Sequence, residues 1–197
     1  MRLKKESTEQ KLRGAYYTPK ALSDAMVSLF VTDTPRNVLE PSCGDGVFID
    51  SIQSCGMLDK IGVVTAVEIV AAEAHKVRKR YQNAKNVDVI TDDFLEFYER
   101  SYQKEQYELI LGNPPYIRYQ YLTETQREIQ SQILTSHGMK SNKLINAWVC
   151  FLVACVQMLS DNGKIAFVVP AEILQVAYAE DLRLFLTNQL SQITLIT

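Results

Sequence analysis

The chain has 197 residues, a formal net charge of -2, four cysteines and 47% hydrophobic residues. These values are typical of one globular domain and exclude disordered, collagen-like and coiled-coil chains. The most apolar stretch, residues 144–159, is interrupted by Asn146 and Gln157 and is too short to cross a bilayer. The N-terminus lacks the apolar centre of a secretory signal, so we expect a cytoplasmic protein with free thiols, no membrane span and no metal site.

The first half of the chain is predicted to alternate helices and strands. Thr18 and Pro19 are typical of a helix N-cap and first helical position. The expected apolar face of that helix consists of Leu22, Met26, Leu29 and Phe30. The elements predicted next are a strand at 37–40, a glycine turn at 41–46, a helix at 47–54, a strand at 63–67 ending at Glu68, and a basic helix containing Lys76 to Arg80.

The second half continues the alternation. The predicted elements are strands at 87–91 and 107–111, a polar and flexible loop at 123–143, a buried helix at 144–159, a turn at 160–163, a fifth strand at 165–169, a helix at 180–190 and a sixth strand beginning at 193–196. Strands that are near-continuous apolar runs between helices indicate a doubly wound, mostly parallel α/β domain of the Rossmann-like type. Ligands bind such sheets beyond the carboxyl ends of the strands, where the polar clusters of this sequence lie.

A glycine turn follows the first predicted strand. It consists of Glu40, Pro41, Ser42, Cys43, Gly44, Asp45 and Gly46. Its glycines suit a tight turn and a close approach of the backbone to a ligand. The full GxGxxG pattern is missing, and the charges of Glu40 and Asp45 would repel a pyrophosphate but suit a ligand with an ammonium and a sulfonium. The charges therefore favour S-adenosylmethionine over NAD, and the incomplete glycine pattern argues against a nucleotide-dependent oxidoreductase.

Two further acids stand at strand ends. Glu68 closes the second strand about twenty residues beyond the glycine turn, where doubly wound folds place an acid that accepts the ribose hydroxyls of a nucleoside. Asp93, followed by Phe94, closes the third strand, where a carboxylate can accept from the adenine amino group of a cofactor while a ring packs on the base. Asp92 is the competing candidate for this position.

Asn113-Pro114-Pro115-Tyr116 is the most specific feature of the sequence. An aromatic amine such as that of adenine is a poor nucleophile, because its lone pair is delocalised into the ring. The Asn113 side-chain oxygen and the Pro114 carbonyl can accept the two amino protons and localise that pair in the transition state. The prolines fix the backbone in advance, and Tyr116 offers a face for an extruded base.

Together these residues resemble the adenine-specific DNA methyltransferases of restriction-modification systems, in the gamma arrangement. The resemblance covers nearly the whole of 1–197 as one catalytic domain with an N-terminal helical segment at 1–35. Residues 15–19 resemble the opening motif, 38–48 the glycine-turn motif, 113–116 the catalytic motif, 146–151 the motif after it, and 163–174 the next strand and loop.

The resemblance implies a site for each group of residues. Catalysis is expected at Asn113, Pro114, Pro115 and Tyr116. Contacts with S-adenosylmethionine are expected from Tyr17, Thr18, Glu40, Pro41, Ser42, Cys43, Gly44, Asp45, Gly46, Glu68, Ile69, Asp93, Phe94 and Asn113. The implied partner is duplex DNA with a flipped adenine.

The sequence departs from the family at its end. It stops inside the sixth predicted strand, before the family's closing hairpin and target-recognition domain. We therefore expect a fold that is incomplete at its C-terminus, with base recognition supplied by a missing domain or a specificity subunit. The weakly acidic net charge agrees with that expectation, because phosphate contacts usually bring a basic surplus.

Two alternatives stay open. Methyltransferases that modify protein glutamine side chains also use an Asn-Pro-Pro-Tyr motif. The opening Tyr17-Thr18-Pro19 segment, and Arg118 and Tyr119 after the catalytic motif, favour DNA. The second alternative is a catalytically inert fragment that still binds the cofactor.

Overall fold

A computed structural model describes residues 17–175 and 179–197. Its centre is a five-stranded parallel sheet in the order β3-β2-β1-β4-β5. The strands are β1 (Asn37–Glu40), β2 (Val63–Glu68), β3 (Val87–Thr91), β4 (Tyr107–Gly112) and β5 (Leu159–Phe167). The predicted doubly wound fold is confirmed. Residues 1–16, which include the first two of the five residues of the predicted opening motif, lie outside the described residues.

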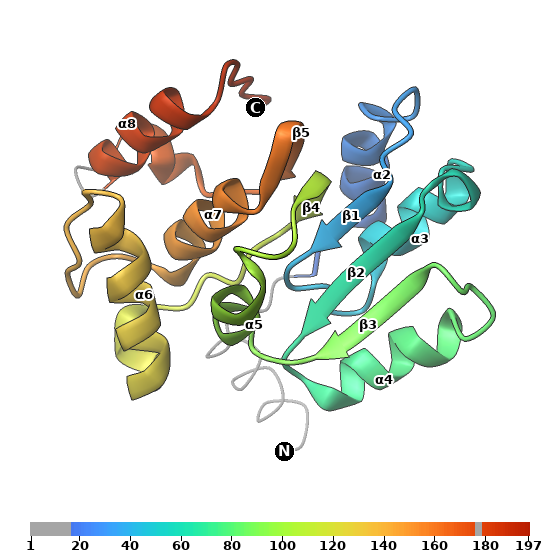
Figure 1. Cartoon of the computed structure of the whole chain (residues 1–197), viewed down its shortest axis with the longest axis horizontal. Coiled ribbons are helices and arrows are strands. Elements are labelled where there is room, and N and C mark those ends of the chain that lie inside the picture. Colours follow the sequence, from blue (N-terminus) through green and yellow to red (C-terminus); the bar gives the residue numbers. More distant parts are fainter. Residues whose placement is uncertain (1–16, 176–178) are drawn as a thin grey trace.

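Helices cover both faces of this sheet, as Figure 1 shows. The α-helices are α2 (Lys20–Ser28), α3 (Val47–Ser54), α4 (Ala71–Arg80), α5 (Phe94–Ser101), α6 (Glu124–Ser136), α7 (Ala147–Gln157) and α8 (Glu180–Gln189). Short 3₁₀ helices are η1 (Leu58–Lys60), η2 (Tyr119–Tyr121) and η3 (Ala171–Leu174). Helices α2, α3 and α4 pack with the sheet around one buried cluster, and α5, α6, α7 and α8 around another.

The order of the strands positions the site. The chain runs outward from β1 to β2 and β3, then crosses back so that β4 pairs with the other edge of β1. This reversal is the topological switch point of a doubly wound sheet, and it opens a crevice beyond the carboxyl ends of β1 and β4. The glycine turn and the Asn113 loop leave the sheet at these two ends, so the topology brings them together.

Helix α6 replaces the flexible loop predicted at 123–143. Thr123 and Gln126 form a capping box at its start, in which each side chain binds the backbone N–H of the other residue. Ile129, Ile133 and Leu134 are buried against α7 and its neighbours. The prediction was wrong because the helix carries many polar residues on its outer face and only a narrow apolar stripe.

The boundaries of α7 and β5 also differ from those predicted. Leu144 is 78% exposed, and α7 begins only after Asn146, whose side chain accepts a hydrogen bond from the N–H of Trp148. Strand β5 begins at Leu159 rather than at residue 165. The turn-forming residues 160–163 lie within it as a register shift opposite β4, with Asn162 at φ 62°. Turn residues can form such an irregularity without ending a strand.

The sixth strand predicted at 193–196 does not form in the described chain. Residues 191–197 carry no strand, and Ile193, Leu195 and Ile196 are exposed. Apolar alternation makes a strand only where neighbouring backbone supplies a ladder of hydrogen bonds.

The start of α2 differs as well. Pro19 is the N-cap and the helix begins at Lys20, so Thr18 does not cap it. Ser23 and Val27 are buried. Of the predicted apolar face, Phe30 is buried and Met26 packs against the core, whereas Leu22 and Leu29 are exposed. The buried hydroxyl of Ser23 lies in hydrogen-bond contact with that of Ser51, which joins this face of α2 to α3.

Candidate active site

A cavity of about 550 Å³ lies at the carboxyl ends of the strands. Ten residues predicted for the site line it: Tyr17, Pro41, Ser42, Gly44, Glu68, Ile69, Asp93, Phe94, Asn113 and Pro115. The structure therefore brings the glycine turn, the two acidic strand ends and the Asn113 loop to one place. The other predicted site residues do not line it: Glu40, Cys43, Asp45, Gly46, Pro114, Thr18 and Tyr116. Thr18 and Tyr116 contact Asn113, which does.

The glycine turn adopts the backbone that only glycine takes up readily. Gly44 has φ 54° and Gly46 has φ 82°, both in the left-handed region. The N–H of Cys43 donates to the Val67 carbonyl at 2.9 Å, which ties the turn to β2. A Cβ on Gly46 would lie 3.0 Å from a methyl group of Val77 on α4. The turn is therefore tightly packed, and the Cys43 side chain is buried rather than lining the cavity.

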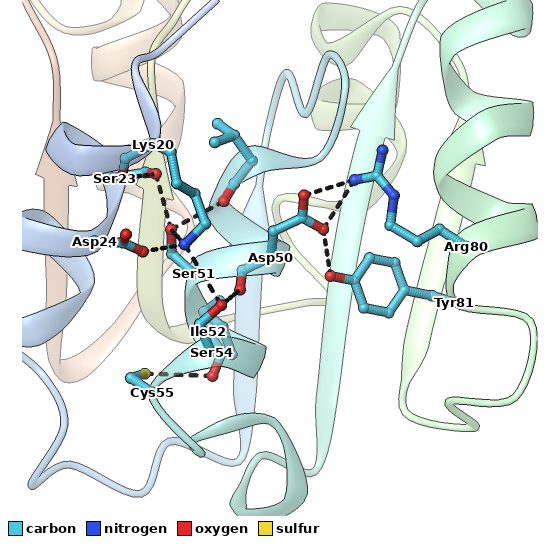
Figure 2. A network of polar contacts seen from close by, with 11 residues as sticks. Lys20, Ser23, Asp24, Asp50, Ser51, Ile52, Ser54, Cys55, Arg80 and Tyr81 are labelled. Carbon is cyan, nitrogen blue, oxygen red and sulfur yellow. Dashed lines mark hydrogen bonds and ion pairs between the residues drawn. The ribbon is translucent and has the colours of Figure 1, made fainter.

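Polar contacts hold the helix after the turn on two sides (Figure 2). On one side, the hydroxyls of Ser51 and Ser23 lie 2.8 Å apart in the interface between α3 and α2. On the other, Arg80 of α4 pairs with Asp50 at 2.7 Å and donates to the Asp45 carbonyl at 2.9 Å. Arg80 thus connects α4 with the turn itself, so the glycine turn is braced from outside the cavity.

Glu68 is fixed by two backbone donors. Its Oε2 accepts from the N–H of Gly44 at 2.8 Å and its Oε1 from the N–H of Val70 at 2.7 Å. The side chain is buried and lines the cavity. Each carboxylate oxygen has more than one acceptor site, so the acid can bind ribose hydroxyls while it keeps these contacts. This is the geometry expected of the acid at the end of the second strand.

Acidic groups gather around the turn. Glu40 is 2% exposed, and its Oε2 is buried without a hydrogen-bond partner among the described residues. Burial, together with the charges of Asp45, Glu68 and Asp50, raises the pKa of Glu40 well above its ordinary value. Burial also raises the pKa of Asp45. The surroundings of the turn therefore disfavour added negative charge and suit a cationic ligand.

Asp93 and Asp92 take different roles. Asp93 is the N-cap of α5, with its Oδ1 accepting from the N–H of Leu95 at 2.8 Å. Its Oδ2 accepts from the side-chain amide of Gln126 at 2.5 Å. Asp92, which also reaches the cavity, is paired with Arg100. Asp92 is engaged in this ion pair. Asp93, which precedes Phe94, is therefore the better candidate for contact with the adenine ring of a cofactor.

Asn113 lies between two side-chain partners. Its Nδ2 donates to the hydroxyl of Thr18 at 3.2 Å, and its Oδ1 accepts from the hydroxyl of Tyr116 at 2.8 Å. The Tyr116 oxygen also lies 3.1 Å from the Val168 carbonyl. Burial raises the pKa of Tyr116 to about 12, so the hydroxyl keeps its proton at neutral pH and can donate it. The sequence predicted Thr18 as a helix cap, whereas its hydroxyl accepts from Asn113 and Pro19 is the N-cap.

The Asn113 loop is hydrogen-bonded to three parts of the fold. The Asn113 carbonyl accepts from the hydroxyl of Ser42 at 3.2 Å, the Gly112 carbonyl from the N–H of Val168 at 3.0 Å, and the Ile117 carbonyl from the N–H of Ala147 at 2.9 Å. The loop is thus anchored to the glycine turn, to the chain after β5 and to α7. These contacts, with the fixed φ of two prolines, hold the loop in one conformation.

Other residues singled out in the sequence are engaged elsewhere. The Tyr116 ring packs against the larger buried cluster and does not line the cavity. The Arg127 guanidinium lies 5.1 Å from the centre of the Tyr119 ring, whereas Arg118 is exposed. Trp148 is fully buried and so belongs to the core.

The structure adds residues that the sequence reasoning did not assign to the site. Tyr121 and Leu122, which precede α6, and Gln126 of its first turn all line the cavity. Gln126 was missed because residues 123–143 were predicted to be a loop, and no feature of the sequence assigned Tyr121 or Leu122 to the site. The spacing of Thr123 and Gln126 was the available signal, since it is the pattern of a capping box.

In residues 17–175 and 179–197 no helix is long and apolar enough to cross a membrane. Within the same ranges no three His, Cys, Asp or Glu side chains are grouped so that they could hold a metal ion.

The fold is a Rossmann-like one that this chain shares with solved methyltransferase structures. The methyltransferase subunit of a type I restriction-modification system from Streptococcus thermophilus superposes with a TM-score of 0.71 at 18% identity, over 88% of this chain and 38% of that one. A class I S-adenosylmethionine-dependent methyltransferase described as putative, from Listeria monocytogenes, gives a TM-score of 0.70 at 13% identity, over 89% of this chain and 53% of that one.

The sequence comparisons identify the family. The profile of the Eco57I restriction-modification methylase family matches residues 10–197, and the chain belongs to this family. The type II methyltransferase M.HincII of Haemophilus influenzae is 30% identical over 178 residues, which make up 89% of this chain and 31% of the relative. The chain thus spans about a third of the length of this relative.

Proposed function

We propose that this chain is the cofactor-binding and catalytic part of a DNA methyltransferase, and that it transfers a methyl group from S-adenosylmethionine to the exocyclic amino group of adenine. The observation that carries the proposal is the position of Asn113 in a cavity that also contains Glu68 and Asp93. One cavity therefore joins an acceptor for an amino group with two acids suited to a nucleoside. Membership of a restriction-modification methylase family supports DNA as the substrate.

The residues of the cavity fit the proposed cofactor. Glu68 would hold the ribose, Asp93 and Phe94 the adenine, and the turn beside Tyr17 the methionine end. The buried and unpartnered Oε2 of Glu40, in an acidic setting, agrees with a cationic ligand nearby. When bound, S-adenosylmethionine supplies an electrophilic methyl group on a sulfonium.

The chain's own residues would prepare the acceptor. The Oδ1 of Asn113 and the carbonyl of Pro114 accept the two amino protons of the target base and thereby localise its nitrogen lone pair. Thr18 holds the amide of Asn113 from its other end, so that Oδ1 keeps its direction. Stacking of Tyr116 on the base requires its ring to leave the packed position described above.

Several finer features belong to the same proposal. Residues 1–197 form one catalytic domain, and a domain or specificity subunit outside this chain supplies recognition of the DNA sequence. DNA as the substrate places the protein in the cytoplasm. Transfer to a protein glutamine or to cytosine would contradict the adenine assignment, so the test identifies the product.

The test combines methyl transfer with analysis of the product. The chain is incubated with S-adenosylmethionine carrying a labelled methyl group and with mixed-sequence duplex DNA, which is then digested to nucleosides for mass spectrometry. We expect label in N6-methyladenine for the wild type and for Asn188→Ala, an exposed control on α8, and none above background for Asn113→Ala. Label in methylcytosine or in protein, or transfer that persists in Asn113→Ala, would contradict the proposal.

A further inference from the structure

Gln126 extends from the first turn of α6 into the cavity and contacts Asp93. Its Oε1 accepts from the N–H of Thr123 at 2.9 Å, and its Nε2 donates to Asp93 Oδ2 at 2.5 Å. The side chain lines the cavity together with Asp93 and Phe94. A residue that caps a helix is thus also part of the wall of the site.

These contacts fix which way the amide of Gln126 points. A backbone N–H can only donate, so Thr123 requires the oxygen of the amide on its side. A carboxylate can only accept, so Asp93 requires the nitrogen on the other side. The amide cannot flip without losing both hydrogen bonds. Asp93 is fixed as well, because its other oxygen accepts from the N–H of Leu95.

Capacity for further hydrogen bonds remains on both groups. Nε2 carries two N–H donors, of which Asp93 takes one, and Oδ2 of Asp93 has a second acceptor site. The cavity therefore presents a donor beside an acceptor, next to the apolar side chains of Phe94 and Leu122. A flat heteroaromatic ring with an amino group next to an acceptor nitrogen complements this pair, as in a 6-aminopurine. A 6-oxopurine has the opposite pattern.

We propose that Gln126 is a specificity-determining residue, which together with Asp93 selects the 6-aminopurine ring of the cofactor. The inference rests on the proposed binding of S-adenosylmethionine. It assigns to α6 a role in cofactor selection and explains why the amide of Gln126 is fixed from both ends.

The test compares two ligands by titration calorimetry. S-adenosylhomocysteine carries the 6-amino group, and S-inosylhomocysteine carries a 6-oxo group in its place. Gln126→Glu is the central variant, because glutamate still completes a capping box but offers no N–H and places a second acid against Asp93. Gln126→Ala removes both functions. Thr123→Ala loses half of the capping box and keeps Gln126, and Gln132→Ala changes an exposed position of the same helix.

The wild type is expected to prefer the 6-amino ligand. Loss of one hydrogen bond should reduce this preference by roughly 2–10-fold in Gln126→Ala, and at least as much in Gln126→Glu. Thr123→Ala and Gln132→Ala should keep the wild-type preference, even if Thr123→Ala lowers the melting temperature. A merely structural role would weaken both ligands equally.

The outcomes separate this inference from the function on which it rests. If the wild type binds the 6-amino ligand and both Gln126 variants keep the full preference, the role of Gln126 is overturned and the proposed cofactor stands. If the folded wild type binds neither ligand, the proposed cofactor fails and the inference fails with it.

Discussion

The two ends of the cavity are held by different kinds of contact. At the end of the glycine turn, Glu68 is fixed by backbone donors, and the turn is braced from outside by Arg80 and by the packing of α4. At the catalytic end, the amide of Asn113 is held by the hydroxyls of two side chains, Thr18 and Tyr116.

We infer that one end of the cavity is preformed and that contacts at the other end change when the substrate binds. Backbone contacts cannot be exchanged without unfolding a local element, so the cofactor end is preformed. Side-chain hydroxyls can rotate away, so an incoming amino group can replace Tyr116 at the Oδ1 of Asn113. The following predictions test this contrast, beginning with the largest expected effect.

Replacing the acceptor at the catalytic end should affect the rate and leave cofactor binding intact. For Asn113→Ala we expect a loss in kcat of about 10²–10³-fold, the scale found for removal of one group that stabilises a transition state. The affinity for S-adenosylmethionine should change only a few-fold, because Glu68 and Asp93 are untouched. Methyl-transfer rates and calorimetry on the same preparation measure both values. A loss in rate matched by an equal loss in affinity would show that Asn113 acts on cofactor binding and would contradict this prediction.

Adding a methyl group at the preformed end should destabilise the fold. Gly46→Ala forces a left-handed backbone on alanine, at a cost of about 1–2 kcal/mol, and crowds Val77, which adds at least about 1 kcal/mol. Gly56→Ala is the matched control, because Gly56 has φ 71° and no atom within 4 Å of the added Cβ. Urea denaturation should give the larger loss for Gly46→Ala, together with weaker cofactor binding. Equal losses would show that α4 does not brace the turn.

Removing the exchangeable hydroxyl should have a moderate effect. Tyr116→Phe keeps the ring but loses the hydrogen bond that orients Asn113 before the substrate enters, so we expect kcat/KM for DNA to fall by about 2–10-fold while cofactor affinity is unchanged. Tyr102→Phe, a partly exposed position on the surface, serves as the control. An unchanged kcat/KM in Tyr116→Phe would mean that Asn113 does not need this partner.

The smallest effect expected is a change in the pH dependence of stability. The pKa of Glu40 is raised in the folded state above its ordinary value of 4.5, mainly by burial. Over the range from 4.5 up to the folded pKa, the native state keeps a proton that the unfolded state has lost, so stability falls as the pH rises. Glu40→Gln should remove this part of the slope and unfold at a higher temperature than the wild type toward the alkaline end. If the unfolding temperatures of the wild type and Glu40→Gln change with pH along parallel curves, the raised pKa of Glu40 is contradicted.

The sequence predicted the part of the fold that near-continuous apolar runs define. Strands β1, β2, β3 and β4 were located within one residue of their observed ends, because buried parallel strands carry apolar side chains on both faces. The polar residues directly after them then had to meet at one edge of the sheet. The lining of the cavity by Glu68, Asp93 and Asn113 follows from this topology.

The remainder depends on tertiary contacts that a linear pattern does not contain. Helix α6 is mostly polar and is held by a narrow apolar stripe and a capping box. Arg127 contacts the ring of Tyr119, and no rule of sequence spacing predicts this pair. The same holds for the hydrogen bond between Asn113 and Thr18. Gln126 could not be assigned to the site from the sequence either, because its contact with Asp93 depends on the packing of α6.

Titration calorimetry can show whether the cavity binds S-adenosylmethionine through Glu68. We expect saturable binding by the wild type and by Glu96→Ala, an exposed control on α5. For Glu68→Ala we expect affinity at least about tenfold lower, because a hydrogen bond to a charged group contributes about 1.5–3 kcal/mol. No binding by the folded wild type, or equal affinity in Glu68→Ala, would contradict this expectation.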